Sequence, residues 1–231
     1  MPLLTQSPSP CDPASRCPSL EPAVGLSIFV VALIVFGVIA GQVVRGMPIT
    51  LLDAHIAYWL HKQATPSLTA AMLVFTNLHG VSAMSWWAIV FGLYLAYRKA
   101  RCWLMVASIA IAGGMVLNVA LKHAFQRARP SFEEPLLTLS TYSFPSGHTA
   151  GSTIFYGVLA AYLCSRTTSN TGRLFIVSTT VALILIVGLS RMYLGVHYFT
   201  DVIAAIAEGC AWLALVLTVV SRLRRRMCPR P

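Results

Sequence analysis

Charged side chains are rare in this sequence, and acidic ones are the rarest. Asp, Glu, Lys and Arg make up 10% of the 231 residues, with seven acidic residues against seventeen basic ones. A soluble globular domain carries about 25% charged residues, so this scarcity excludes an ordinary soluble domain. What the sequence has instead is apolar residues, which make up 57% of it and give a mean hydropathy of +0.72. The protein is therefore predicted to lie in a membrane.

Apolar segments without charge are long enough, or nearly so, to cross a bilayer as helices, which takes about 20 residues. They lie at 24–44, 102–121, 149–165 and 174–190, and a fifth, at 202–221, contains only Glu208. The charge-free stretch 63–97 is too long for one straight span, and residues 77–80 offer a break inside it. We interpret 80–97 as a sixth span. The preceding 66–78 then forms a shorter helix at the outer surface, or an extension of that span.

The expected fold class is all-α: a six-transmembrane-helix bundle with a short outer interfacial helix. Apolar residues recur at helical spacing within 46–65 with polar residues between them, which is typical of a helix lying in the interface. We expect a disordered cytoplasmic tail at 1–23, a six-span membrane domain at 24–221 and a basic cytoplasmic tail at 222–231. Basic residues favour the cytoplasmic side, which places both termini in the cytoplasm.

The net charge of +10 does not by itself indicate a nucleic-acid partner. Basic residues at the ends of spans act as topology signals, and the cluster 222–230 can also contact anionic headgroups. The sequence shows no aromatic-interleaved basic pattern of the kind that binds nucleic acid. The bilayer is therefore the expected partner, and nucleic acid is not.

Basic residues nevertheless remain on the outer side, and most of them lie in three polar blocks at 122–130, 145–148 and 190–201. In the predicted topology all three blocks reach the same, extracytoplasmic side. They combine three cations, two histidines and one carboxylate, which is the inventory for holding a phosphate and attacking its phosphorus. These residues are Lys122, Arg129, His148, Arg191, His197 and Asp201.

The first two blocks offer donors for an anion. Lys122 and Arg129 are seven residues apart, so on a continued helix both face the same way, and their head groups suit different oxygens of one phosphate. The alternative for these two is snorkelling at a helix end. Ser146 and Gly147 can offer hydroxyl and amide donors at a helix N-terminus, or the serine can act as a helix cap. His148 is placed to give a proton to a departing oxygen.

The third block is the most specific. His197 and Asp201 are four apart, so a helical turn puts them side by side. Asp201 can then fix the tautomer of His197 and leave the other ring nitrogen free as a nucleophile. Arg191 adds a third cation for phosphoryl oxygens. A structural His–Asp pair is the alternative, and Glu208, inside the last span, is either functional or a hydrogen-bonded helix contact.

The spacing of the three blocks resembles a family signature. The pattern is Lys, six residues, Arg-Pro; then Pro-Ser-Gly-His; then Ser-Arg, five residues, His, three residues, Asp. It resembles the signature of the type 2 phosphatidic acid phosphatase superfamily, which also includes the vanadium haloperoxidases. Every signature position is matched, in order, between residues 122 and 201.

The resemblance implies a role for each residue. His197 attacks phosphorus and forms a phosphohistidine, Asp201 orients it, and His148 protonates the leaving group and later activates water. The phosphoryl oxygens are held by Lys122, Arg129, Ser146, Gly147 and Arg191. No metal or other cofactor is then expected, because the three cations replace it, and the scarcity of nearby carboxylates also argues against a magnesium site.

The expected function is a metal-independent membrane lipid phosphatase. Its substrate is a lipid phosphate or diphosphate of the undecaprenyl diphosphate, phosphatidic acid or phosphatidylglycerol phosphate type, anchored in the outer leaflet. Two alternatives stay open: a lipid phosphotransferase, and a non-catalytic member that binds or transports phospholipids.

Overall fold

The computed structural model describes residues 20–227, which form eight α-helices and no strand. The helices are α1 (Pro22–Val44), α2 (Ile49–Lys62), α3 (Pro66–Asn77), α4 (Val81–Tyr97), α5 (Arg101–Phe125), α6 (Gly147–Arg166), α7 (Asn170–Tyr193) and α8 (Phe199–Met227). The all-α prediction is confirmed. Residues 1–19 of the tail predicted at 1–23 lie outside the described residues. Helix α1 begins at Pro22, within that predicted tail. The predicted basic tail is helical up to Met227, and 228–231 lie outside the described residues.

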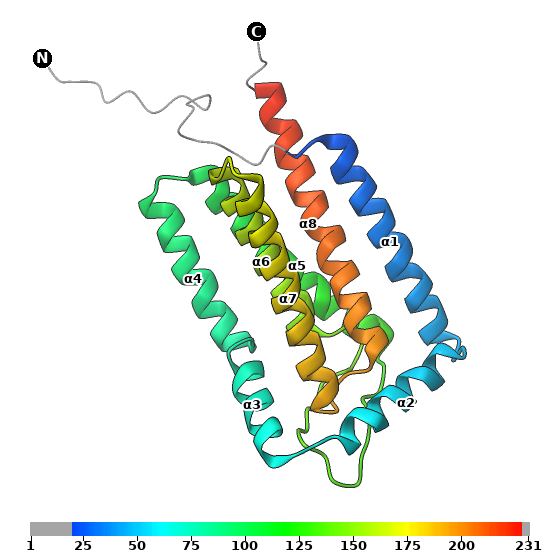
Figure 1. Ribbon diagram of the computed structural model, residues 1–231. Helices are drawn as coiled ribbons and strands as arrows, with labels where there is room; N and C mark the ends of the chain where they lie inside the picture. The colour runs from blue at the N-terminus through cyan, green and yellow to red at the C-terminus, as the bar shows by residue number, and fades with distance from the viewer. Residues whose placement is uncertain (1–19, 228–231) are drawn as a thin grey trace, which may run out of the picture.

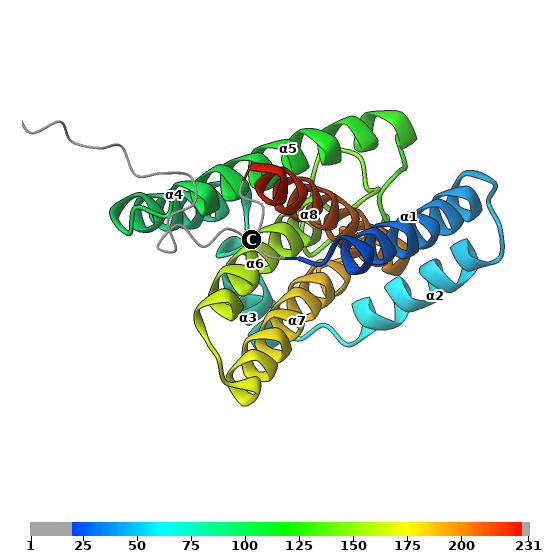
Figure 2. The same cartoon turned by 90° about the horizontal axis from the view of Figure 1, so that it is seen from above.

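The long helices form a bundle with α8 in its middle. Seen from above, α8 lies between α1, α5 and α6 (Figure 2). The largest buried cluster joins α4, α5, α6 and α8, with Leu95, Trp103, Val106 and Val158 at most 1% exposed. By contrast, α1 and α7 expose large apolar side chains outward, such as Val31 at 60% and Phe175 at 72%. A surface of that kind suits contact with lipid rather than water.

Four helices are long and apolar enough to cross a membrane, namely α1, α5, α7 and α8. The pair α3 and α4 passes the same test as one bent span, so the described residues contain four to five candidate spans. Of the two other helices, α2 is short, and α6 holds the segment expected at 149–165 but is not a candidate by this measure. Its buried side carries Thr149, Ser152 and Thr153, which lower its hydropathy. The multi-pass architecture is confirmed, whereas the count of six spans stays a prediction.

The polar break expected at 77–80 separates two helices. Between α3 and α4 the chain bends by 45°. Thr65 caps the beginning of α3 by accepting a hydrogen bond from the Leu68 amide. This part of the sequence thus forms a short helix followed by a longer one, and because the pair also passes the length and hydropathy test as one bent span, both interpretations of 66–78 stay predictions.

The short helix α2 crosses one end of the bundle (Figure 1). It turns apolar residues such as Leu51 and Trp59 outward, with 65% and 61% of their surface exposed, and buries Asp53 and Leu60. Helix α1 begins, and helix α8 ends, at the opposite end of the bundle (Figure 1). The end that α2 crosses also holds the α5–α6 loop and the α7–α8 connection (Figure 1).

Candidate active site

The three polar blocks meet at the end of the bundle that α2 crosses. The C-terminal ends of α5 and α7 and the N-terminal ends of α6 and α8 all lie there. The loop at 126–146 joins α5 to α6, and residues 194–198 join α7 to α8. The Ser146 amide of the second block donates to the Asp201 carbonyl of the third, at 3.1 Å. Arg129 of the first block donates to the Val196 carbonyl of the third, at 2.5 Å. Hydrogen bonds to backbone carbonyls of the third block therefore hold the blocks in one site.

His197 lies between Arg129 and Asp201. Its Nδ1 is 3.4 Å from Asp201 Oδ2, and its Nε2 is 3.2 Å from Nη1 of Arg129. A guanidinium only donates hydrogen bonds, so Nε2 is the accepting nitrogen and the ring proton belongs on Nδ1, facing Asp201. At 3.4 Å that nitrogen makes no hydrogen bond of good geometry within residues 20–227.

Burial sets the charge of this histidine. His197 is 1% exposed, and desolvation lowers its pKa to about 3 although the Asp201 carboxylate acts to raise it. Arg129 and Lys122 lower the pKa further because they are cations nearby. At neutral pH the imidazole is therefore uncharged, and its Nε2 lone pair is available for reaction.

Lys122 and Arg129 approach each other through a turn and not along a helix. The expectation of one continued helix is wrong, because α5 ends at Phe125 and Gln126 adopts a left-handed conformation with φ of 46°. Lys122 Nζ then donates to the Tyr142 carbonyl at 2.8 Å, and Arg129 Nε donates to the Thr141 carbonyl at 2.7 Å. Both cations thus stabilise the α5–α6 loop through hydrogen bonds to its carbonyls, and both bring positive charge to the site.

Arg191, in the last turn of α7, is 1% exposed. Its Nη1 donates to Thr76 Oγ1 of α3 at 2.6 Å. Its Nε and Nη2 are buried and have no hydrogen-bond partner in the described part of the chain. A buried guanidinium with two unpaired donors is a ready ligand for an anion.

The second block opens α6. Ser146 occupies the N-cap position, but its hydroxyl pairs with Thr149 Oγ1 at 3.0 Å and not with a backbone amide. A Cβ atom on Gly147 would lie 3.2 Å from Asn118 Oδ1 and 3.6 Å from Cε of Lys122, so only glycine fits here without displacing a neighbour. His148 follows within electrostatic reach of Arg191, His197 and Arg129. The beginning of α6 therefore points its free amides and its histidine at the site.

Five residues at the site were not predicted from the sequence: Asp53, Arg127, Ser143, Tyr198 and Thr200. Asp201 accepts hydrogen bonds from Nη1 of Arg127 at 2.6 Å, from the Tyr198 amide at 2.8 Å and from the Ser143 hydroxyl. Arg127 also pairs with Asp53 of α2 at 2.7 Å, and Thr200 donates to the same carboxylate. Burial lowers the pKa of Arg127, but the charges of Asp201 and Asp53 outweigh it and leave that pKa raised. The position of Arg127 inside the first polar block was a signal that it lies at the site. No sequence pattern indicates that it pairs with Asp53.

Glu208 makes a hydrogen-bonded helix contact. Nδ2 of Asn118 donates to Glu208 Oε2 at 3.0 Å, while Oε1 has no partner between residues 20 and 227. Asn118 lies one turn before Lys122 on α5 and faces Gly147, so this buried pair lies directly behind the beginning of α6.

The described residues contain no group of His, Cys, Asp or Glu arranged to hold a metal ion. What they bring together is a neutral histidine beside a carboxylate, a second histidine, and three cations, of which Arg191 has unpaired donors. That set suits the transfer of a phosphoryl group, where positioning and charge stabilisation dominate. Fold and site together define a multi-pass membrane enzyme of the phosphatase class.

The family follows from comparison with known proteins. The model of the PAP2 superfamily matches residues 101–225, more than half of the chain, and the chain belongs to that superfamily. Phosphatidylglycerophosphatase B of Bacillus subtilis (strain 168) is 29% identical over 164 residues, which are 69% of this chain and 79% of that protein. Decaprenylphosphoryl-5-phosphoribose phosphatase of Mycolicibacterium smegmatis is 34% identical over 108 residues, 46% of this chain and 53% of that protein.

Two solved structures share the fold. The transmembrane PAP2 type phosphatidylglycerolphosphate phosphatase from Bacillus subtilis superposes with a TM-score of 0.72 at 26% identity, covering 90% of this chain and 98% of that one. LpxE of Aquifex aeolicus superposes with a TM-score of 0.55 at 22% identity, covering 74% and 95%, and shows the fold alone. The predicted enzyme class is confirmed: the chain is a metal-independent lipid phosphatase in a multi-pass membrane fold.

Proposed function

We propose that this lipid phosphatase hydrolyses a lipid phosphate or diphosphate of the phosphatidylglycerol phosphate, phosphatidic acid or undecaprenyl diphosphate type through a phosphohistidine intermediate. The names of the Bacillus relatives favour phosphatidylglycerol phosphate as the first substrate to test. The observation that carries the mechanism is the environment of His197, whose accepting Nε2 faces Arg129 and whose Nδ1 faces Asp201.

In the first step Nε2 of His197 attacks phosphorus while the bond from phosphorus to the lipid oxygen breaks. His148 donates its proton to that departing oxygen and releases the lipid alcohol, or the lipid monophosphate when the substrate is a diphosphate. The Asp201 carboxylate stabilises the positive charge that develops on His197. Lys122, Arg129 and Arg191 balance the phosphoryl oxygens, together with the Ser146 hydroxyl and the Gly147 amide.

In the second step water attacks the phosphohistidine. His148, now unprotonated, takes a proton from that water, the bond between phosphorus and Nε2 breaks, and inorganic phosphate leaves. The proton that His148 gains restores the acid form for the next turnover. Atoms and charges balance over the two steps without a further reactant.

The membrane arrangement proposed with this mechanism has six spans, with α6 as the fourth, the site on the extracytoplasmic side and both termini in the cytoplasm. The beginning of α1 and the end of α8 lie at the same end of the bundle (Figure 1). This arrangement suits an even number of membrane crossings. The basic run at 98–101 and the basic residues at the end of α8 lie away from the end of the bundle that holds the site (Figure 1). This is expected for cytoplasmic segments. A lipid in the outer leaflet can then present its phosphate to the site from within the bilayer plane.

The test is phosphate release by the purified protein from a panel of lipid phosphates in detergent micelles. We expect wild type to release phosphate in the presence of a chelator and to be inhibited by orthovanadate. His197→Ala should lose at least about 1,000-fold in kcat, because removal of a covalent nucleophile leaves only binding and charge stabilisation. His148→Ala should lose activity as well, because the leaving oxygen then departs without the proton that His148 supplies.

The matched control is His55→Ala, the same substitution at an exposed histidine of α2. It should keep wild-type activity. Turnover by His197→Ala close to wild type would contradict the mechanism. A phosphorylated acceptor in place of free phosphate would identify a phosphotransferase, and binding of lipid phosphate without turnover would identify a non-catalytic binding protein.

A further inference from the structure

The interfacial helix α2 turns a carboxylate toward the protein. Asp53 has no exposed surface, although its neighbours Leu51 and Leu52 are at least half exposed on the same helix. Burying an unpaired carboxylate is strongly unfavourable. An aspartate in this position therefore requires partners that make the burial acceptable, and those partners show what the residue does.

Within residues 20–227, every hydrogen bond of the Asp53 side chain goes to the loop or the helix that builds the active site. Oδ1 accepts from the Thr200 amide at 3.0 Å, and Oδ2 accepts from the Thr200 hydroxyl at 2.5 Å. Oδ2 also pairs with Nη2 of Arg127 at 2.7 Å. Thr200 immediately precedes Asp201 in the chain, so α2 is tied to the first turn of α8 beside the candidate catalytic carboxylate.

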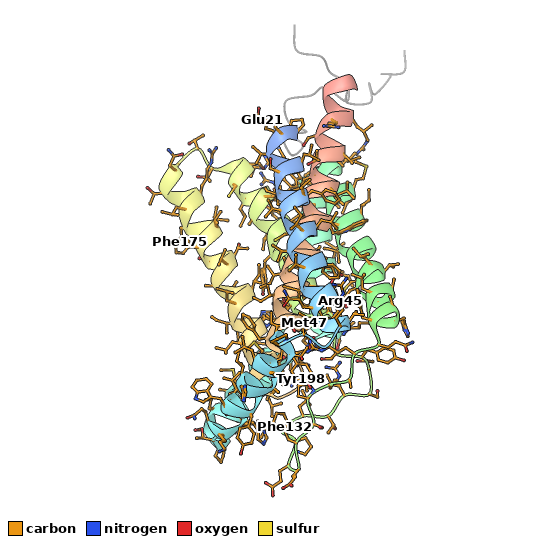
Figure 3. The ribbon with its side chains drawn as sticks, turned by 90° about the vertical axis from the view of Figure 1, so that its right-hand side faces the viewer. Glu21, Arg45, Met47, Phe132, Phe175 and Tyr198 are labelled. Atoms are coloured by element: carbon orange, nitrogen blue, oxygen red, sulfur yellow. The ribbon has the colours of Figure 1, made fainter. Side chains whose placement is uncertain are left out.

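Arg127 lies between two carboxylates. One of its nitrogens, Nη1, is 2.6 Å from Asp201 Oδ1 and 2.8 Å from the Thr200 hydroxyl, while the other pairs with Asp53. The Tyr198 ring covers the guanidinium, with Cζ 4.2 Å from the ring centroid. Figure 3 shows Tyr198 at the end of the bundle that α2 crosses. His197, Asp201, Arg127 and Asp53 thus form one continuous row of alternating partners.

The charges in that row decide how Asp201 acts on His197. If Arg127 paired with Asp201 alone, it would neutralise the carboxylate and draw it away from the imidazole, from which it is already 3.4 Å distant. Asp53 shares the guanidinium, so the trio of Asp53, Arg127 and Asp201 keeps a net charge of −1. This charge is available to stabilise the imidazolium that forms as His197 attacks.

We propose that Asp53 and Arg127 are positioning residues for the phosphatase reaction, through which α2 holds Asp201 in place and keeps its charge available to His197. The proposal rests on the proposed function of His197 and Asp201. Neither residue is offered as a ligand of the substrate, so their loss should act on the chemical step and not on lipid binding.

The experiment is a double-mutant cycle of Asp53→Asn and Arg127→Gln on the purified protein, with kcat and KM measured for phosphatidylglycerol phosphate. Each single variant should lose roughly 10- to 100-fold in kcat, with KM little changed. This is the range typical for the loss of a hydrogen-bond partner that orients a metal-ligating residue. The double variant should lose no more than the worse single variant, because both changes disrupt one row. The charge-matched controls Glu134→Gln and Arg45→Gln, at exposed positions, should behave as wild type.

Losses in kcat that multiply in the double variant would overturn the proposal, and so would a wild-type kcat in Asp53→Asn. In both cases the proposed function would still stand, because the wild-type protein would still release phosphate from the lipid. A wild-type protein that releases no phosphate from any lipid overturns both. Unfolding temperatures are measured alongside, since a purely structural role would lower them without separating kcat from KM.

Should the charge variants fail to fold, Thr200 supplies the test. Thr200→Val keeps the size of the side chain but removes the hydroxyl between Asp53 and Arg127, whereas Thr200→Ser keeps the hydroxyl. We expect Thr200→Val to lower kcat at an unchanged KM. Thr200→Ser should retain the wild-type kcat. Equal activity of the two variants would overturn the proposal.

Discussion

His197 illustrates at the scale of one residue how burial and partners prepare a side chain for reaction. A free histidine is partly protonated near pH 6.5 and is then a poor nucleophile. Desolvation holds the pKa of His197 at about 3, and a donor on one side with a carboxylate on the other orients the ring. The same burial makes the folded state sensitive to acid, because the unfolded chain can take up a proton that the folded chain refuses.

The stability of the protein should therefore fall as the pH drops from 7 to 5. The pKa of His197 is lower in the folded state than in the unfolded state, so its contribution is present above the unfolded value of about 6.5 and is lost progressively below it. For this one group the loss between pH 7 and 5 amounts to about 2 kcal/mol. His197→Gln should lose correspondingly less over the same range. Thermal unfolding of both proteins at the two pH values measures the difference, and identical acid sensitivity would contradict a neutral buried His197.

At the scale of elements, close contact between α6 and α8 sets the distance between the two histidine-bearing blocks. A Cβ atom on Gly209 of α8 would lie 2.8 Å from Thr153 Cβ and 3.4 Å from the Ala150 carbonyl of α6. Small residues let membrane helices approach this closely. The helix that carries His148 is thus held against the helix that carries Asp201 by the absence of a side chain.

Gly209→Val should separate these helices and lower both stability and activity. Overpacking of this kind costs about 1–3 kcal/mol, and a shift of about 1 Å at reacting groups lowers the rate by roughly 100-fold. Gly37→Val on α1 is the matched control, because a Cβ atom there meets nothing within 4 Å. Unfolding temperature and phosphate release are measured for both. Gly209→Val behaving like the control would show that this contact does not set the geometry of the site.

The sequence could predict the elements whose signal is local. Long charge-free runs mark α1, α5, α7 and α8, and the Asn77–Gly80 segment marks the bend before α4. It could not predict that Arg127 bridges Asp53 and Asp201, because the partners are each 74 residues away and no spacing encodes such a contact. Nor could it predict the left-handed Gln126, since glycine is the usual residue there. That turn is why Lys122 and Arg129 meet around a loop.

At the scale of the whole molecule, one end of the bundle gathers buried and half-buried charged side chains, and the helices behind it present apolar surface. Arg127, Arg129, Arg191 and Asp201 lie there together with Asp53, whereas α1 and α7 are covered outward by exposed aliphatic and aromatic side chains. In the proposed function, the phosphate of the substrate meets the polar end of the bundle and its lipid half lies against the apolar surface. The site residues then act on the phosphate, and the choice of lipid belongs to the surfaces around them.

The most direct test of the account is to trap the phosphorylated enzyme. Wild type is mixed with phosphatidylglycerol phosphate carrying a radioactive terminal phosphate, denatured within a turnover in alkali, and digested to locate the label. The phosphohistidine mechanism predicts an acid-labile, alkali-stable phosphate on the peptide that contains His197, absent in His197→Ala and unchanged in His55→Ala. Label on another residue, or free phosphate released by wild type with no labelled protein at any time, would contradict it.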